Sequence, residues 1–267
     1  MLGRLFSGWQ RAREARALRR HAIPDELWQL TLARYPFLAA RSVADLAELR
    51  RLCSLFLAEK EFHGAAGFVV SDEVALAVAA QACLPVLRLG LAPYRSFVGI
   101  VMHAGEVLAP REVMDEDGIV HQYDERLAGE AMEGGPLMLA WSEVEYGADP
   151  AAGLDSVYNV VIHEFAHVLD MADGAADGVP LLPDAAARRA WLEVIEAEWQ
   201  WFCEQVDEGY ATLVDPYGAE GLEEFFAVAV EAFFVAPLEL REEQPALYRL
   251  LADYFAQDPA AAPSPAA

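Results

Sequence analysis

His163-Glu164-Phe165-Ala166-His167, enclosed by the apolar residues 160–162 and 168–169, is the stretch that decides the fold of this chain. Side chains four positions apart lie above one another on one face of an α-helix, so the two imidazoles can reach one metal ion. Glu164 follows the first histidine by one position and therefore points to the side. There it can approach a metal-bound water without binding the metal, and the spacing predicts a metal site with a general base beside it.

Zinc explains why these residue types stand together. A zinc ion with three protein ligands and an open fourth position lowers the pKa of its bound water toward neutrality. A neighbouring carboxylate can take the proton as that water attacks a carbonyl carbon. The motif therefore favours a zinc-dependent hydrolase acting on peptide bonds, and the alternative is an ordinary helix with two hydrogen-bonded histidines.

The residues around the motif indicate a buried helix. Apolar side chains recur at the spacing of a core-facing helix, at Tyr158, Val161, Ile162, Phe165, Val168 and Leu169. Two histidines and a glutamate are costly in such a helix unless they have partners. This cost favours the metal site over the ordinary helix.

A third ligand must come from elsewhere in the chain. The short extension that supplies a third histidine in metzincins is missing, because residues 170–174 read Asp-Met-Ala-Asp-Gly. Residues 220–234 form a second, almost wholly apolar helical segment. Glu224 and Glu231 share one face of it, whereas Glu223 turns partly away. Periodicity leaves both Glu224 and Glu231 as candidate ligands.

Asp170 stands three residues after His167, near the same helix face. Metal-bound histidines usually donate their other ring nitrogen to an acceptor such as a carboxylate. Asp170 is therefore a candidate for supporting a ligand histidine. The alternative is an acid at the end of the helix that bonds the turn at Asp173-Gly174.

The motif and several distant segments together resemble the Mlc titration factor A family of bacterial zinc peptidases. The resemblance covers roughly residues 20 to 257. It is carried by residues 163–170 (HEFAHVLD), 215–217 (DPY) and 224–228 (EFFAV), and upstream by residues 79–85, 110–113, 129–131 and 135–136.

The resemblance implies a set of residue roles. In that family, and in the similar catalytic domain of anthrax lethal factor, a tyrosine stands seven residues before the ligating glutamate. Tyr217 and Glu224 have this separation. The resemblance thus makes Tyr217 an oxyanion donor beside the base Glu164, makes Glu231 a supporting or structural acid, and implies a zinc site of His163, His167 and Glu224.

Tyr217 has two other interpretations on sequence alone. It can be an exposed tyrosine in the turn Asp215-Pro216-Tyr217-Gly218. Tyr210, seven residues earlier, competes for the same role if the loop runs differently. A donor to the oxyanion would stabilise the transition state by roughly 3 kcal/mol.

Composition indicates one compact domain. The chain has 267 residues, of which 55% are hydrophobic, enough to bury a substantial core. We expect a basic N-terminal extension over residues 1–20, a single domain over 21–257 and a disordered tail over 258–267. The extension carries six arginines against one glutamate.

Charge and apolar runs restrict location and partners. The net charge of −24 argues against direct binding of nucleic acid, which depends on basic residues. The start of the chain lacks the apolar core of a secretory signal, and the most apolar window, residues 74–87, is too short to span a bilayer. Three cysteines without a C-x-x-C pair favour a reducing compartment. We expect a cytoplasmic protein.

Secondary-structure patterns predict an α+β fold. Helices are expected near residues 24–36, 43–60 and 72–83, and, from Tyr158 onward, at the active-site motif and near 184–206, 220–235 and 243–256. Short β-prone runs within residues 96–142 predict a small mixed sheet. With the resemblance, this becomes a mostly helical zincin-type metallopeptidase domain with the sheet over the active-site helix. We expect residues 137–141 to form its edge strand, which an extended peptide substrate could pair with.

Two functions follow from the resemblance. The first is a zinc-dependent peptidase of the aminopeptidase type, acting on small peptide substrates. The second is a cytoplasmic protein that binds and sequesters a transcriptional repressor of the Mlc type, with catalysis secondary or absent. Glu164 separates them, because repressor binding does not need a carboxylate beside a metal-bound water.

Overall fold

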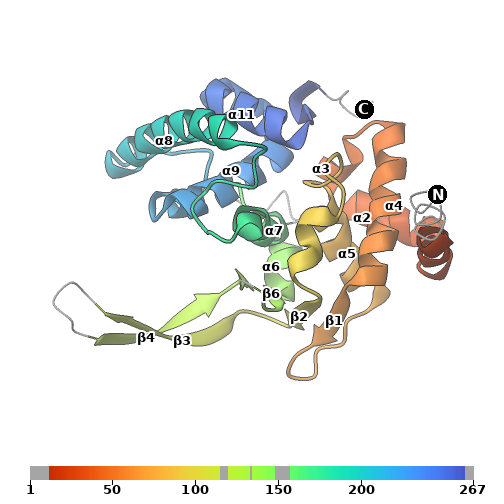
Figure 1. Cartoon of the computed structure of the whole chain (residues 1–267). Helices are drawn as coiled ribbons and strands as arrows, with labels where there is room; N and C mark the ends of the chain where they lie inside the picture. Colours follow the sequence, from red (N-terminus) through yellow and green to blue (C-terminus); the bar gives the residue numbers. More distant parts are fainter. Residues whose placement is uncertain (1–11, 115–119, 133, 148–156, 262–267) are drawn as a thin grey trace.

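The computed structural model describes residues 12–114, 120–132, 134–147 and 157–261. Its first part is a group of helices on one side of the molecule (Figure 1). Residues 12–20 are helical. They are followed by α2 (Asp25–Arg34), α3 (Pro36–Ala39), α4 (Val43–Glu59), α5 (Asp72–Cys83) and the short 3₁₀ helix η1 (Ala92–Ser96).

Local sequence explains where these helices begin and end. The hydroxyl oxygens of Ser42 and Ser71 accept hydrogen bonds from backbone N–H groups in the first turns of α4 and α5. The expected helix over 24–36 is divided, because α2 ends at Arg34 and Pro36 begins α3. A proline cannot donate the backbone hydrogen bond that would continue a helix.

The sheet is small and mixed. Its strands lie in the order β1 (Glu61–Gly64), β2 (Gly99–His103), β6 (Leu137–Ala140) and β5 (Gly129–Ala131). The first three are parallel, and β5 runs antiparallel to β6. Strands β3 (Val107–Met114) and β4 (Val120–Leu127) form a separate antiparallel ribbon, which projects from the body of the molecule (Figure 1).

Helices dominate the rest of the chain. The long helix α8 (Ala185–Asp207) and α11 (Pro245–Phe255) lie on the side of the molecule opposite the ribbon (Figure 1). The remaining elements are α6 (Trp141–Tyr146), α7 (Val160–Asp170), η2 (Met171–Asp173), η3 (Pro216–Ala219), α9 (Leu222–Val235), α10 (Pro237–Glu243) and η4 (Pro259–Ala261).

The core holds α7 and α9 in place. Phe165 of α7 is fully buried, with its ring centroid 4.9 Å from that of Tyr94 and 5.7 Å from that of Phe56. Every residue of α9 from Phe225 to Phe234 is buried. Burying aromatic side chains of this size contributes strongly to stability, so the two helices that carry the motif residues are fixed by packing.

The expected fold class is confirmed. The chain is mostly helical, and the small mixed sheet lies against α7 through β5 and β6. Among the described residues, we find no helix long and apolar enough to cross a membrane.

The edge-strand prediction was wrong. Residues 137–140 form β6, which lies between β2 and β5 and is buried along its whole length. The edge strands are β1 and the three-residue strand β5. A run of apolar residues such as 137–140 is typical of an inner strand, because both of its faces are covered.

Described residues on both sides of the expected domain, 21–257, contact it. Residues 258–261 pack on the domain, since Pro259 is buried and the backbone N–H of Ala260 donates to the Tyr248 hydroxyl at 3.0 Å. Residues 12–20 contribute Glu14, which pairs with Arg51 of α4. Residues 1–11 of the basic extension and 262–267 of the expected tail lie outside the described residues.

Candidate metal centre

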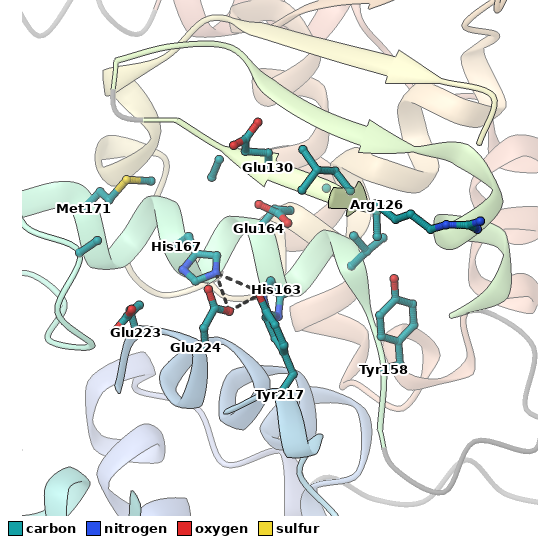
Figure 2. A pocket seen from close by; sticks show the side chains of 16 residues that line it. Arg126, Glu130, Tyr158, His163, Glu164, His167, Met171, Tyr217, Glu223 and Glu224 are labelled. Atoms are coloured by element: carbon teal, nitrogen blue, oxygen red, sulfur yellow. Dashed lines mark hydrogen bonds and ion pairs between the residues drawn. The ribbon is translucent and has the colours of Figure 1, made fainter. Parts of the chain in front are cut away.

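Helix α7 presents its two histidines to a pocket. Asn159 caps the helix, because its side-chain oxygen accepts a hydrogen bond from the Ile162 N–H at 2.9 Å. His163 and His167 then lie one turn apart on the same face. Their Nε2 atoms are 3.1 Å from each other (Figure 2).

Glu224 of α9 completes a triangle with the two histidines. Its Oε2 atom lies 3.2 Å from His163 Nε2 and 3.3 Å from His167 Nε2. Burial acts to raise the pKa of Glu224, but the two imidazoles lower it to about 2. The carboxylate is therefore ionised at neutral pH, as a metal ligand must be.

The donor atoms fit a metal ion. Glu224 Oε2 is buried and has no hydrogen-bond partner of good geometry, although it faces two ring nitrogens. Leaving such an atom unsatisfied is costly. His163, His167 and Glu224 are also the group among the described residues whose ligand atoms lie close enough together to hold a metal ion. One cation between these atoms would satisfy all three.

Glu231 orients His163. Its Oε1 atom lies 2.8 Å from His163 Nδ1, and its Oε2 atom accepts a hydrogen bond from the backbone N–H of Asn159. Glu231 is fully buried about two turns along α9 from the pocket-facing Glu224. The two acids that periodicity left as equal candidates thus have different positions. Glu224 faces both Nε2 atoms, and Glu231 holds the far side of one imidazole.

Asn159 links this pair to a third helix. Its side-chain Nδ2 donates to Gln81 Oε1 of α5 at 2.7 Å, and Gln81 Nε2 donates to the Ala77 carbonyl at 3.0 Å. Every one of these groups is buried and hydrogen-bonded. Such a network is stable only when all of its members are satisfied, and it fixes the ring of His163.

Glu164 lies on the other side of α7, facing strand β5 (Figure 2). Its side chain is buried, with 5% of the residue exposed. Burial raises the pKa of Glu164, and the charge of Glu224 adds to this effect. His163, His167 and a backbone hydrogen bond from Ala131 act in the opposite direction. The carboxylate therefore borders the pocket without joining the triangle of ligand atoms.

Tyr217 lies beside His163, with their ring centroids 6.3 Å apart. It belongs to η3, where the Asp215 carboxylate accepts a hydrogen bond from its backbone N–H at 2.9 Å. The residue is 43% exposed and lines the pocket, and Figure 2 shows it next to the histidines. Tyr210, its competitor in the sequence, is exposed and is not among the lining residues.

Asp170 has partners other than the ones we expected. Its carboxylate accepts hydrogen bonds from the backbone N–H groups of Gly178 at 3.0 Å and Val179 at 2.8 Å. Burial raises the pKa of Asp170 to about 6, although these two donors act to lower it. Asp170 thus ties the end of α7 to the following loop, and the carboxylate that contacts the Nδ1 atom of a motif histidine is that of Glu231.

These side chains surround one pocket of about 420 Å³. Strand β5 and the residues before it form one wall, and α7, η3 and the start of α9 form the other (Figure 2). The lining includes the acids Glu130 and Glu223 as well as Glu164 and Glu224, against a single arginine, Arg126. The pocket is therefore predominantly acidic.

Some residues of the site had only weak sequence signals. Asn159 stands directly before an apolar helical run, which is a typical N-cap signal, and Gln81 is a polar residue inside an apolar window. Strand β5 contains Gly129, Glu130 and Ala131 and has no β-prone pattern. It could not be recognised before its pairing with β6 was known.

Comparison with known proteins places this chain in a family. A family model described as glucose-regulated metallo-peptidase M90 matches residues 8–256. An uncharacterized protein of Synechocystis sp. is 36% identical over 257 residues, which cover 95% of this chain and 91% of that protein.

Two further relatives carry a functional name. Mlc titration factor A of Pectobacterium atrosepticum is 33% identical over 242 residues, 88% of each chain. Mlc titration factor A of Cronobacter sakazakii is 32% identical over 237 residues, which cover 87% of this chain and 86% of that protein. The chain therefore belongs to the glucose-regulated metallo-peptidase M90 family and is a relative of the Mlc titration factor A proteins.

Proposed function

We propose that this chain is a cytoplasmic zinc-dependent peptidase of the aminopeptidase type, with His163, His167 and Glu224 as metal ligands. The observation that carries the proposal is the triangle of ligand atoms, whose sides measure 3.1, 3.2 and 3.3 Å. Ligands bound to tetrahedral zinc at about 2.0–2.1 Å are about 3.3 Å from one another. Two imidazoles and a carboxylate are also the donor types found in hydrolytic zinc sites.

The support of His163 by Glu231 agrees with this proposal. A carboxylate accepts hydrogen bonds, so the contact at 2.8 Å assigns the proton of the imidazole to Nδ1. The lone pair of Nε2 is then directed to the side of Glu224 and His167. Zinc-binding histidines usually have such a hydrogen-bonded carboxylate or carbonyl partner.

The other side chains have roles in moving protons and stabilising charge. A bound zinc ion would supply Lewis acidity, which polarises the scissile carbonyl and lowers the pKa of water. Glu164 takes the proton of the attacking water on its carboxylate and delivers it to the leaving amine. The Tyr217 hydroxyl donates a hydrogen bond to the oxygen that becomes negatively charged in the tetrahedral intermediate.

The acidic pocket favours substrates with a free amino terminus. Apart from the ligand Glu224 and the base Glu164, whose charges a zinc ion would offset, Glu130 and Glu223 line it, and Arg126 is its single arginine. An α-ammonium group is attracted by such a field, whereas an acetylated terminus is neutral. This charge distribution supports cleavage of the first residue of a peptide rather than cleavage within a long chain.

Amino-acid anilides test this function directly. Wild-type protein and Glu164→Gln are purified, their bound zinc is measured, and both are assayed with free and N-acetylated anilides. We expect about one zinc per chain in both proteins, and cleavage of the free anilides by the wild type alone. Cleavage by both proteins at equal rates would remove Glu164 from the mechanism, and a lack of zinc in both would refute the metal site.

A second function is proposed from the names of the relatives. Several are called Mlc titration factor A, which says of those proteins that they titrate Mlc. We propose that this chain can also bind a transcriptional repressor of that type. Glu164→Gln is the discriminating variant, because it should lose peptidase activity and keep repressor binding in a pull-down with a purified Mlc-type repressor.

A further inference from the structure

Strand β5 passes directly over Glu164, and one of its residues has no space for a side chain. A Cβ atom added to Gly129 would lie 2.5 Å from Glu164 Oε1, 2.6 Å from its Cγ and 2.7 Å from its Cδ. Atoms that are not bonded to one another do not approach this closely. The Glu164 carboxylate thus occupies the position that a side chain at residue 129 would take.

The backbone at Gly129 does not itself require glycine. Gly129 is absent from the described residues with positive φ, which include Gly134 and Gly174. A strand backbone of this kind is open to any residue. Glycine within a strand weakens it and often marks a close approach by another group. Here the group that approaches is Glu164.

The pairing of β5 with β6 leaves the backbone groups of Gly129 and Ala131 on the side of Glu164. The Ala128 carbonyl accepts a hydrogen bond from the Ala140 N–H at 2.8 Å, and Gly129 and Ala131 pair in register with Leu139 and Leu137. In an antiparallel pair, alternate residues direct their backbone groups to the partner strand and away from it. The backbone N–H and C=O groups of residues 128 and 130 therefore point to β6, whereas those of residues 129 and 131 point away from it. The outward N–H of Ala131 forms the backbone hydrogen bond with Glu164.

We propose that Gly129 is a positioning residue for the general base, because its missing side chain leaves the space that holds the Glu164 carboxylate against β5. The proposal rests on the peptidase function proposed above, in which Glu164 moves the proton. Gly129 lines the pocket but contributes no ligand atom to the metal site. Gly129 affects the reaction only through the position and orientation of the Glu164 carboxylate.

Gly129→Ala should therefore damage the base more than the fold. The atoms that the new methyl group meets belong to a flexible side chain, and the pocket lies open beside them. Glu164 can swing into the pocket while His163, His167 and Glu224 stay in place. We expect unchanged zinc content, a KM within about twofold of wild type and a kcat lowered by about 10- to 100-fold, as displacement of a reacting group by about 1 Å typically produces.

A second glycine of the same sheet is the matched control. A Cβ atom at Gly99 of β2 would meet the Pro136 Cβ at 3.4 Å, which is ordinary van der Waals contact. Gly99→Ala should keep the zinc content, KM and kcat of the wild type. The pair of variants separates the loss of a strand glycine from the loss of space for Glu164.

Two measurements do not depend on catalysis. A crystal structure of Gly129→Ala should show the Glu164 carboxylate moved away from β5, with the two histidines where they are in the wild type. Melting temperatures should show coupling, because in the Glu164→Ala background the methyl group at position 129 meets none of the atoms that it would displace. Any loss of stability caused by Gly129→Ala alone should therefore be reduced in the double variant.

The outcomes keep the two proposals apart. A wild-type kcat in Gly129→Ala, an unmoved Glu164 in its crystal structure, or equal losses of stability in both backgrounds would overturn the role of Gly129. If the wild type cleaves no anilide while Glu164 moves and the stabilities are coupled, the positioning contact stands and the peptidase function fails.

Discussion

The two ring nitrogens of His163 have separate partners, and this division explains much of the site. Nδ1 faces the buried carboxylate of Glu231, and Nε2 faces Glu224 and His167. In the neutral imidazole that a metal ion would bind, the contact with Glu231 favours the tautomer with its proton on Nδ1. It leaves the lone pair of Nε2 directed to the position where a metal ion would be shared.

The proposed hydrogen bond from the Tyr217 hydroxyl to the oxyanion can be tested by removing that one hydroxyl group. Tyr217→Phe removes the hydrogen-bond donor and keeps the ring beside His163. We expect kcat to fall by about 100-fold with zinc content unchanged, because loss of one oxyanion donor typically costs this much. Steady-state kinetics on a free amino-acid anilide measures it.

Tyr210→Phe is the control for that variant. Tyr210 is exposed and lies outside the pocket lining. The kcat and KM of Tyr210→Phe should therefore match those of the wild type. A Tyr217→Phe enzyme with wild-type kcat would exclude Tyr217 from the reaction.

At the scale of elements, a buried polar network joins three helices. It runs from Gln81 of α5 through Asn159, the N-cap of α7, to Glu231 of α9. Each link fixes the relative position of two helices and the orientation of His163. The network therefore connects the packing of the core to the geometry of the candidate metal site.

Glu231→Gln should weaken metal binding without removing a ligand. The carboxylate has one oxygen for His163 and one for Asn159, but an amide has only one acceptor oxygen for these two donors. We expect zinc affinity to fall by about 10- to 100-fold, as for other supports of metal-binding histidines. Competition with a chelator of known affinity measures it.

Glu223→Gln is the matched control on the same helix. Glu223 lines the pocket next to Glu224 in the sequence, and removal of its charge leaves the contact between Glu231 and His163 intact. Its zinc affinity should stay within about threefold of wild type. Equal losses in both variants would show that net charge, and not the orientation of His163, determines the affinity.

Asp170 should make stability depend on pH through the loop that follows α7. Burial raises the pKa of Asp170 to about 6 in the folded protein, from an ordinary value of 3.8. Between these values the folded state binds a proton that the unfolded state has released, so the free energy of unfolding falls as the pH rises. Asp177 and Tyr254 are the other titratable groups that interact with Asp170.

Asp170→Asn isolates this contribution because an amide does not titrate in this range. Urea unfolding of both metal-free proteins at about pH 4.5 and about pH 7.5 gives the comparison. The stability of the wild type relative to the variant should fall by about 1 to 2 kcal/mol between the two. A difference that is constant with pH, or that grows as the pH rises, would contradict the raised pKa.

Predictability from sequence differed between helices and strands. Helix α5 has the predicted bounds because Ser71 provides a clear N-cap signal, and α7 follows its apolar periodicity. Strands β1 and β5 have three or four residues each, and their existence depends on pairing with distant segments. The choice between Glu224 and Glu231 also needed tertiary structure, since both lie on one face of α9 and only the packing of α9 against α7 separates them.

On the scale of the whole molecule, the candidate ligands connect two distant parts of the chain. His163 and His167 belong to α7, and Glu224 belongs to α9, with the long helix α8 between them in the sequence. We propose that residues 21–261 form a single domain, because the buried apolar residues form one cluster from Ile23 to Phe255. A metal ion held between α7 and α9 would stabilise that domain as a unit.

Zinc should therefore raise the melting temperature of the protein after chelator treatment. At a free zinc concentration about 100 times the dissociation constant, binding adds about 2.7 kcal/mol. For a domain of this size that corresponds to an increase of about 5 °C or more. Glu224→Ala, measured in the same way by calorimetry, should show a much smaller increase. Equal increases in both proteins would indicate that zinc binds elsewhere.

The most direct test of the account is X-ray anomalous diffraction from crystals of the purified protein, recorded on both sides of the zinc absorption edge. The account predicts one zinc peak per chain, bounded by His163 Nε2, His167 Nε2 and Glu224 Oε2. A peak at other residues, or zinc-loaded crystals without a peak between these three atoms, would contradict it.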